Sequence, residues 1–154
     1  MTFDLLNTKD TGLVGAVGET IAWQYLWENG IVGFSFGQGR PWFANKFVEH
    51  QPTFDRSWLK KRQANYLKDL KEHGPRRWDF VGTRPREHGK RNRTVYLIEV
   101  KVRRQGKSRH DLRGSLKGKI PEDLEKAKSL GFVPLLLIID LLGNWEFEVT
   151  SREL

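Results

Sequence analysis

Cysteine is absent from this sequence of 154 residues. Disulfide frameworks, cysteine-based zinc sites, iron–sulfur clusters and a cysteine nucleophile are therefore excluded together. Long apolar runs are also missing: no window approaches the roughly 20 residues that a membrane-spanning helix needs. The first residues lack the basic-then-apolar layout of a secretory signal. These absences predict a cytoplasmic protein without a membrane partner.

Charge is plentiful but unevenly distributed. The chain has 27 Lys and Arg against 19 Asp and Glu, a formal net charge of +8. Residues 84–119 alone carry 13 basic and 3 acidic side chains, whereas the remainder carries 14 basic and 16 acidic ones. A local field of this sign attracts polyanions, and we expect the partner to be nucleic acid. The segment is interrupted by glycines and lacks the amphipathic pattern of a membrane-surface helix.

Length and periodicity predict one domain over residues 1–154. Hydrophobic spacing and capping residues predict helices over about 10–29, 55–73 and 121–130, and strands over about 31–36, 78–83, 94–103, 133–140 and 145–150. A tight turn at Gly143 and Asn144 is expected before the last strand. This order predicts an α/β fold with a mixed central sheet flanked by helices. Residues 37–77 form a helical insertion between the first and second strands.

The first helix contains two features that need a reason. Glycines recur every third residue near its start, the last being Gly18. A glycine costs up to ~1 kcal/mol inside a helix, so we expect another backbone or a ligand to approach closely. Glu19 follows, on the same helical row as the apolar Ala22 and Leu26, where a carboxylate is out of place without a partner. The alternative is that Glu19 lies on the solvent-exposed face of the helix.

Residues 96–103 carry the sharpest chemical signal. Alternate residues of a strand share a face, so Glu99 and Lys101 point the same way, opposite to an apolar face. The preceding strand supplies Asp79 between two aromatic residues. If these strands pair as neighbours, Asp79 and Glu99 converge. Taken alone, Glu-x-Lys on a strand is usually a solvated ion pair, and a single aspartate can be an ordinary strand-edge carboxylate.

Two carboxylates a few ångströms apart repel unless one is protonated or a cation bridges them. Mg²⁺ suits such a pair, because it takes one or two protein carboxylates and keeps water and substrate phosphate as its other ligands. A metal there can activate water and neutralise charge that develops on a phosphoryl group. Lys101 beside it can orient the water or stabilise the phosphate as a point charge.

The order of these residues resembles the PD-(D/E)xK nuclease superfamily: Gly18-Glu19 on the first helix, Asp79 in Trp-Asp-Phe-Val, and Glu99-Val-Lys101 on the next strand. The layout is most similar to small archaeal Holliday junction resolvase-like nucleases. The resemblance implies a restriction-endonuclease-like core, a homodimer, and Mg²⁺- or Mn²⁺-dependent hydrolysis of DNA, with branched or junction DNA as the candidate substrate. It also implies that Asp79 and Glu99 are metal ligands, that Glu19 is an accessory ligand, and that Lys101 is the catalytic lysine.

The basic residues around Glu99 and Lys101 are expected to bind the nucleic-acid backbone. They are Arg84, Arg86, Lys90, Arg91, Arg93, Arg103, Arg104, Lys107, Arg109 and Arg113. Two other interpretations stay open. One is a non-catalytic nucleic-acid-binding module that keeps the fold, and the other is a nuclease directed at RNA.

Overall fold

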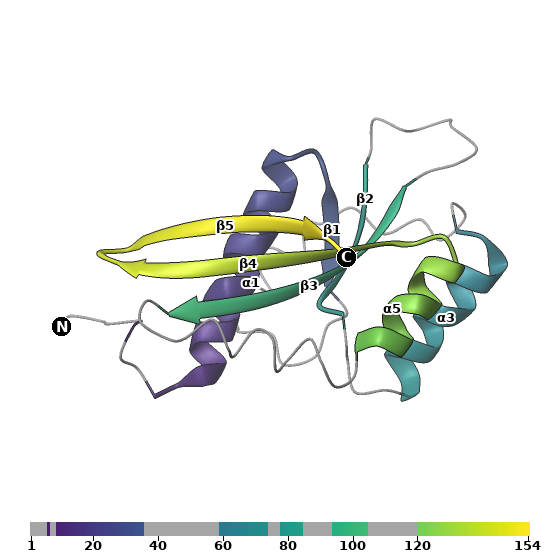
Figure 1. Ribbon diagram of the computed structural model, residues 1–154, viewed down its shortest axis with the longest axis horizontal. Coiled ribbons are helices and arrows are strands. Elements are labelled where there is room, and N and C mark those ends of the chain that lie inside the picture. The colour runs from purple at the N-terminus through teal and green to yellow at the C-terminus, as the bar shows by residue number, and fades with distance from the viewer. Residues whose placement is uncertain (1–5, 7–8, 36–58, 74–77, 85–93, 105–119) are drawn as a thin grey trace.

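The computed structural model describes residues 6, 9–35, 59–73, 78–84, 94–104 and 120–154 (Figure 1). Its elements, in chain order, are α1 (Thr11–Glu28), β1 (Val32–Ser35), α3 (Lys61–His73), β2 (Phe80–Thr83), β3 (Val95–Arg104), α5 (Ile120–Ser129), β4 (Val133–Gly143) and β5 (Glu146–Glu153). The predicted α/β class and the predicted order of elements are confirmed. Helix α3 lies within the predicted insertion. No helix in these ranges is both long and apolar enough to cross a membrane.

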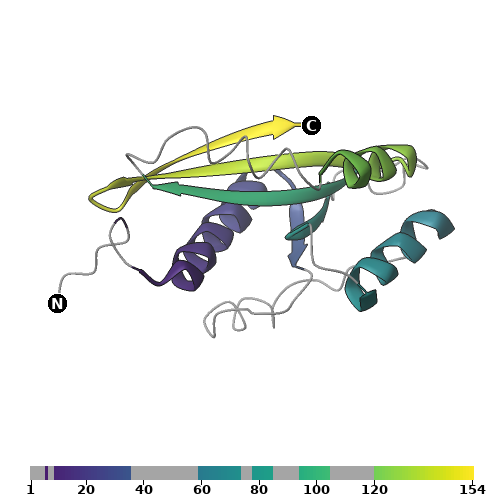
Figure 2. The same ribbon diagram turned by 60° about the horizontal axis from the view of Figure 1, so that its bottom comes forward.

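The five strands form one mixed sheet in the order β1-β2-β3-β4-β5. Strands β1, β2 and β3 make an antiparallel meander, β4 runs parallel to β3 after the crossover through α5, and β5 returns antiparallel to β4. Pairing between β2 and β3 covers only Val95–Ile98 of β3, whereas pairing with β4 continues to Arg104. The long strands therefore extend well past the two short ones (Figures 1 and 2).

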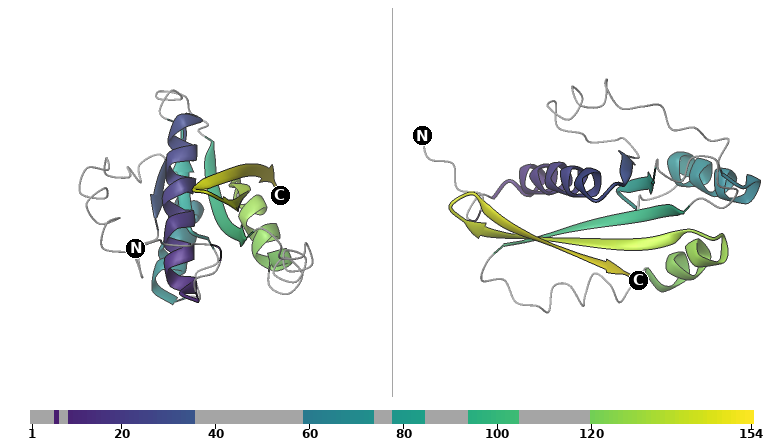
Figure 3. Two further views of the ribbon diagram at one scale, coloured as in Figure 1. Left: turned by 90° about the vertical axis from the view of Figure 1, so that its left-hand side faces the viewer. Right: turned by 90° about the horizontal axis from the view of Figure 1, so that it is seen from above.

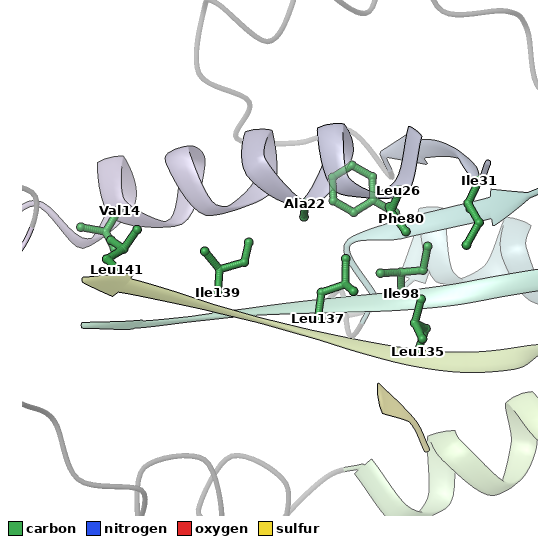
Figure 4. Close-up of a cluster of buried hydrophobic side chains, with 10 residues drawn as sticks. All are labelled: Val14, Ala22, Leu26, Ile31, Phe80, Ile98, Leu135, Leu137, Ile139 and Leu141. Atoms are coloured by element: carbon green, nitrogen blue, oxygen red, sulfur yellow. The ribbon is translucent and has the colours of Figure 1, made fainter. Parts of the chain in front are cut away.

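Helix α1 covers one face of this sheet. Asp10 caps its start by accepting a hydrogen bond of 3.0 Å from the Leu13 amide, which satisfies one of the donors that a helix leaves unpaired. Its buried residues Val14, Ala22 and Leu26 pack against the apolar side chains that β3 and β4 present to that face (Figure 4). Helix α5 lies on the opposite side of the long strands (Figure 3).

A second cluster fills the other face near the start of β3. Tyr66 of α3 and Ala127 of α5 are buried there together with Leu97 of β3. Because Ile98 is fully buried under α1, the first half of β3 is enclosed from both sides. This enclosure accounts for its uninterrupted apolar sequence.

Three details differ from the sequence-based expectations. The last turn has its two central residues at Asn144 and Trp145, with φ of 50° and 62°, rather than at Gly143 and Asn144; two positive φ values are what a tight hairpin requires. Helix α3 begins at Lys61, where the Lys60 amide donates to the Gln63 side chain at 3.0 Å. Trp27 of α1, whose position one residue after Leu26 led us to expect it within a wide buried stripe, is 54% exposed.

Candidate active site

The pairing of β2 with β3 brings Asp79 beside Glu99. Phe80 is the register partner of Ile98, and Asp79 and Glu99 are the next residues outward on their strands. The Asp79 amide donates to the Ile98 carbonyl at 2.8 Å, and its carboxylate oxygen Oδ2 accepts from the Val100 amide at 2.7 Å. Asp79 thus immediately precedes the start of β2, and its side chain accepts the Val100 hydrogen bond at a position where the β2 backbone no longer pairs with β3.

The surroundings of Asp79 disfavour its charged form. Burial raises the pKa of this carboxyl to about 6, the hydrogen bond from Val100 lowers it, the negative charge of Glu99 raises it and Lys101 lowers it. Desolvation is the largest of these effects, as expected for a carboxylate withdrawn from water. Acids with a raised pKa beside a second acid are more frequent at functional sites than elsewhere.

Glu99 and Lys101 form an ion pair along one face of β3. The Lys101 Nζ lies 2.6 Å from Glu99 Oε1, and the side chains are 35% and 15% exposed, respectively. The residues that alternate with them, Val100 and Val102, pack with the α1 cluster on the other face. The predicted split of β3 into an apolar and a charged face is therefore confirmed.

Gly18 holds α1 close to this part of β3. A Cβ atom at Gly18 would overlap Val102 Cγ2, so the close neighbour of this glycine is a side chain and not the backbone or ligand that the sequence led us to expect. Gly15 differs, because a Cβ there would meet nothing within 4 Å. The helix therefore approaches the charged half of β3 closely at Gly18, on the face opposite Glu99 and Lys101.

Glu19 lies on α1, the helix that covers the apolar face, and is partly buried. Within the residues that the structure describes, no group of three or more His, Cys, Asp or Glu side chains is placed to hold a metal ion. The structure thus brings Asp79, Glu99 and Lys101 together and does not add Glu19 to them. A role for Glu19 as an accessory ligand stays a prediction.

Three of the ten basic residues expected at the nucleic acid are described, and each has a partner within the chain. Arg84 donates from Nε to the Tyr96 hydroxyl and from Nη1 to the Asn29 carbonyl, both at 3.0 Å. Arg104 donates to the Leu6 carbonyl at 3.3 Å. The third, Arg103, pairs with Asp140. The other seven lie outside the described residues: Arg86, Lys90, Arg91, Arg93, Lys107, Arg109 and Arg113.

Asp140 is the charged residue that sequence reasoning missed. It stands opposite Arg103 in the parallel register of β3 and β4 and accepts two hydrogen bonds of 2.6 Å, from Arg103 Nε and Nη2. The only signal in the sequence is its place at the end of the apolar run 133–139. The pairing itself depends on the register between two strands that are joined through a crossover.

This arrangement can do specific chemistry. Two adjacent carboxylates can hold a hard divalent cation, and an ammonium and a guanidinium on the same face can contact phosphate oxygens. No protein-family model matches the chain, and neither a curated protein nor a solved structure matches it.

Proposed function

We propose that this protein is a Mg²⁺-dependent nuclease that hydrolyses phosphodiester bonds of DNA, with branched or junction DNA as the favoured substrate. The observation that carries the proposal is the placement of Asp79, immediately before β2, beside the Glu99–Lys101 pair of β3. The element order gives further support. The motif resemblance implies a core of a helix, a three-stranded meander, a crossover helix and a further strand, and the described elements follow this order with α3 inserted between β1 and β2.

The donor set fits Mg²⁺ or Mn²⁺. Asp79 is withdrawn from water and repelled by Glu99, and a cation between the two carboxylates would relieve both effects. Glu99 accepts from Lys101 through Oε1, so its second oxygen remains for a cation. Asp79 and Glu99 would hold the metal, and Glu19 is proposed as an accessory ligand. When bound, the metal supplies charge neutralisation and polarises a water molecule.

Lys101 is the cationic side chain that lies beside the two carboxylates. Its side chain is 35% exposed, so a phosphate oxygen can reach the ammonium while Glu99 holds it. An ammonium at this position stabilises the negative charge that develops on the phosphate during attack by water. The hydrogen bond from the Val100 amide fixes the orientation of Asp79 at the same time.

A cleavage assay tests the proposal. Labelled duplex, flap and four-way-junction DNA should be cut in Mg²⁺ and left intact in EDTA. Lys101→Ala should lower the rate by about 10²–10³-fold while binding survives. Lys128→Ala, on the exposed surface of α5, removes the same charge elsewhere and should leave the rate unchanged. Cleavage that persists in Lys101→Ala and Glu99→Ala proteins would overturn the assignment.

The alternative is a non-catalytic module that binds nucleic acid with the same fold. Two observations favour it: Lys101 already neutralises Glu99, and Glu19 does not join the carboxylates in a common cluster within the described residues. This alternative predicts binding without turnover under any divalent metal. Digestion of matched labelled RNA in parallel separates an RNA-directed nuclease from one directed at DNA.

The basic segment 84–119 is proposed to hold the phosphate backbone against the carboxylates. If about 6–10 of its side chains contact phosphates, affinity should fall by about 10³–10⁵ between 50 and 200 mM salt. We also propose that the protein is a homodimer, because cleavage of both strands of a junction would use two copies. Sedimentation at the concentrations of the assay measures it directly.

A further inference from the structure

The Arg103–Asp140 pair lies on the charged face of β3, one alternate position beyond Lys101. Residues two apart on a strand are separated by about 6.6 Å and point the same way. Lys101 and Arg103 therefore present two cations in a row from one rigid strand. Their side chains are 35% and 28% exposed, so both are within reach of a ligand on that face.

Asp140 fixes the guanidinium in one orientation. Two parallel hydrogen bonds of 2.6 Å join the carboxylate to Nε and Nη2 of Arg103, which is the fork geometry that specifies direction as well as distance. These bonds use two of the five N–H donors of a guanidinium, and three are left for another acceptor. A phosphate diester offers oxygen acceptors of the matching charge.

We propose that Asp140 is a positioning residue that holds Arg103 for contact with the phosphate next to the one that is cut. The proposal rests on the proposed nuclease function, because Lys101 and the carboxylates define which phosphate is cut. The ligand class is a nucleic-acid strand, of which two consecutive phosphates lie along β3. Asp140 touches neither the substrate nor the metal and acts through Arg103 alone.

The Asp140→Asn variant distinguishes a positioning role from an effect of charge alone, because the two predict changes of opposite sign in DNA binding. Asp140→Asn removes a negative charge, so simple electrostatics should tighten the binding of DNA. If Asp140 orients Arg103, the same substitution should loosen the guanidinium and raise KM by about tenfold. The contact is made to a phosphate that does not react, so kcat should change much less than KM.

Glu148 provides the matched control. It is the register partner of Asp140 on β5 and is exposed. Glu148→Gln removes the same charge on the neighbouring strand and leaves the two hydrogen bonds between Arg103 and Asp140 in place. We expect KM of the Glu148→Gln protein to fall or stay unchanged.

The experiment measures kcat and KM for a labelled four-way DNA junction in Mg²⁺, and the affinity for the same junction in EDTA, with melting curves to verify folding. Arg103→Lys keeps the charge but cannot form the fork. Arg103→Lys should raise KM as much as Asp140→Asn does. The Arg103→Lys/Asp140→Asn double variant should have a KM no higher than that of either single variant. Asp140→Glu should have a KM close to that of the wild type.

The outcomes separate the two proposals. A wild-type protein that cuts, with Asp140→Asn behaving like Glu148→Gln, overturns the positioning role alone. Multiplicative losses in the double variant overturn it as well. A wild-type protein that binds without cutting overturns the nuclease function, and a tenfold weaker affinity of Asp140→Asn in EDTA still supports the contact. Absence of both binding and cleavage overturns both.

Discussion

The two halves of β3 face different environments. Val95–Ile98 pairs with β2, and from Tyr96 onward also with β4, and is enclosed by both core clusters. Glu99–Arg104 pairs with β4, lies outside the register with β2 and is only partly buried. The first half is apolar and the second carries alternating charges. Burial thus explains the first half completely but not the second, because a fold needs no ion pairs at that position. The charges of the second half are the part of the strand that calls for a function.

The largest effect should come from the core of the first half. Leu97 is fully buried among the side chains of α3 and α5. Leu97→Ala should lower the free energy of unfolding by about 2–5 kcal/mol, because it removes buried methyl groups and leaves a cavity. Urea denaturation measures the loss. Val102→Ala, in the partly buried second half, is the matched control, and an equal loss there would contradict the difference between the halves.

Asp79 should make stability depend on pH. Its pKa in the folded protein is raised from an ordinary 3.8 to about 6, so between these values the folded state holds more protons than the unfolded state. The free energy of unfolding should therefore fall as pH rises from about 4 to about 6 and then level off, by on the order of 2–3 kcal/mol in the absence of divalent metal.

Asp79→Asn provides the comparison for that slope. An amide oxygen can still accept from the Val100 amide but does not titrate, so this fall should vanish in the variant. Mg²⁺ at pH 7 should stabilise the wild type and leave Asp79→Asn unchanged, because only the wild type offers the carboxylate. Parallel pH profiles of the two proteins, from urea titrations at each pH, would contradict the assignment.

Gly18 should matter more than its size suggests. A methyl group at this position would overlap Val102, so Gly18→Ala should push α1 from β3 and cost about 1–3 kcal/mol. Gly15→Ala adds the same methyl group where nothing lies within 4 Å, and there it should stabilise by about 0.5–1 kcal/mol through helix propensity. Opposite signs in thermal melts are the expected result. Equal shifts would show that the close contact does not constrain the helix.

Local sequence patterns predicted these elements but not every contact between them. Hydrophobic spacing and capping residues were enough to place α1, and alternation was enough to assign faces in β3. The sequence placed Asp79 beside Glu99 on the condition that the two strands pair as neighbours, and β2 and β3 do pair. The Asp79–Val100 hydrogen bond depends on the residue at which β2 begins, and the Arg103–Asp140 pair depends on a parallel register. Both are set by tertiary packing, which no local period encodes.

Removing the Glu99–Lys101 pair as a unit should have the smallest effect on stability. Because Lys101 is 35% exposed, solvent screens the pair and its contribution to folding is about 0–1 kcal/mol. The Glu99→Gln/Lys101→Met double variant should therefore unfold within about 1 kcal/mol of the wild type.

Lys101→Met alone should cost more, because it leaves Glu99, only 15% exposed, unpaired beside Asp79. Lys101 also lowers the pKa of Asp79, so the fall of stability with pH should extend to higher pH in this single variant. A double variant less stable than Lys101→Met would show that the pair holds the fold together. If the double variant instead folds normally but neither binds nor cuts DNA, the charges of the second half serve the ligand rather than the sheet.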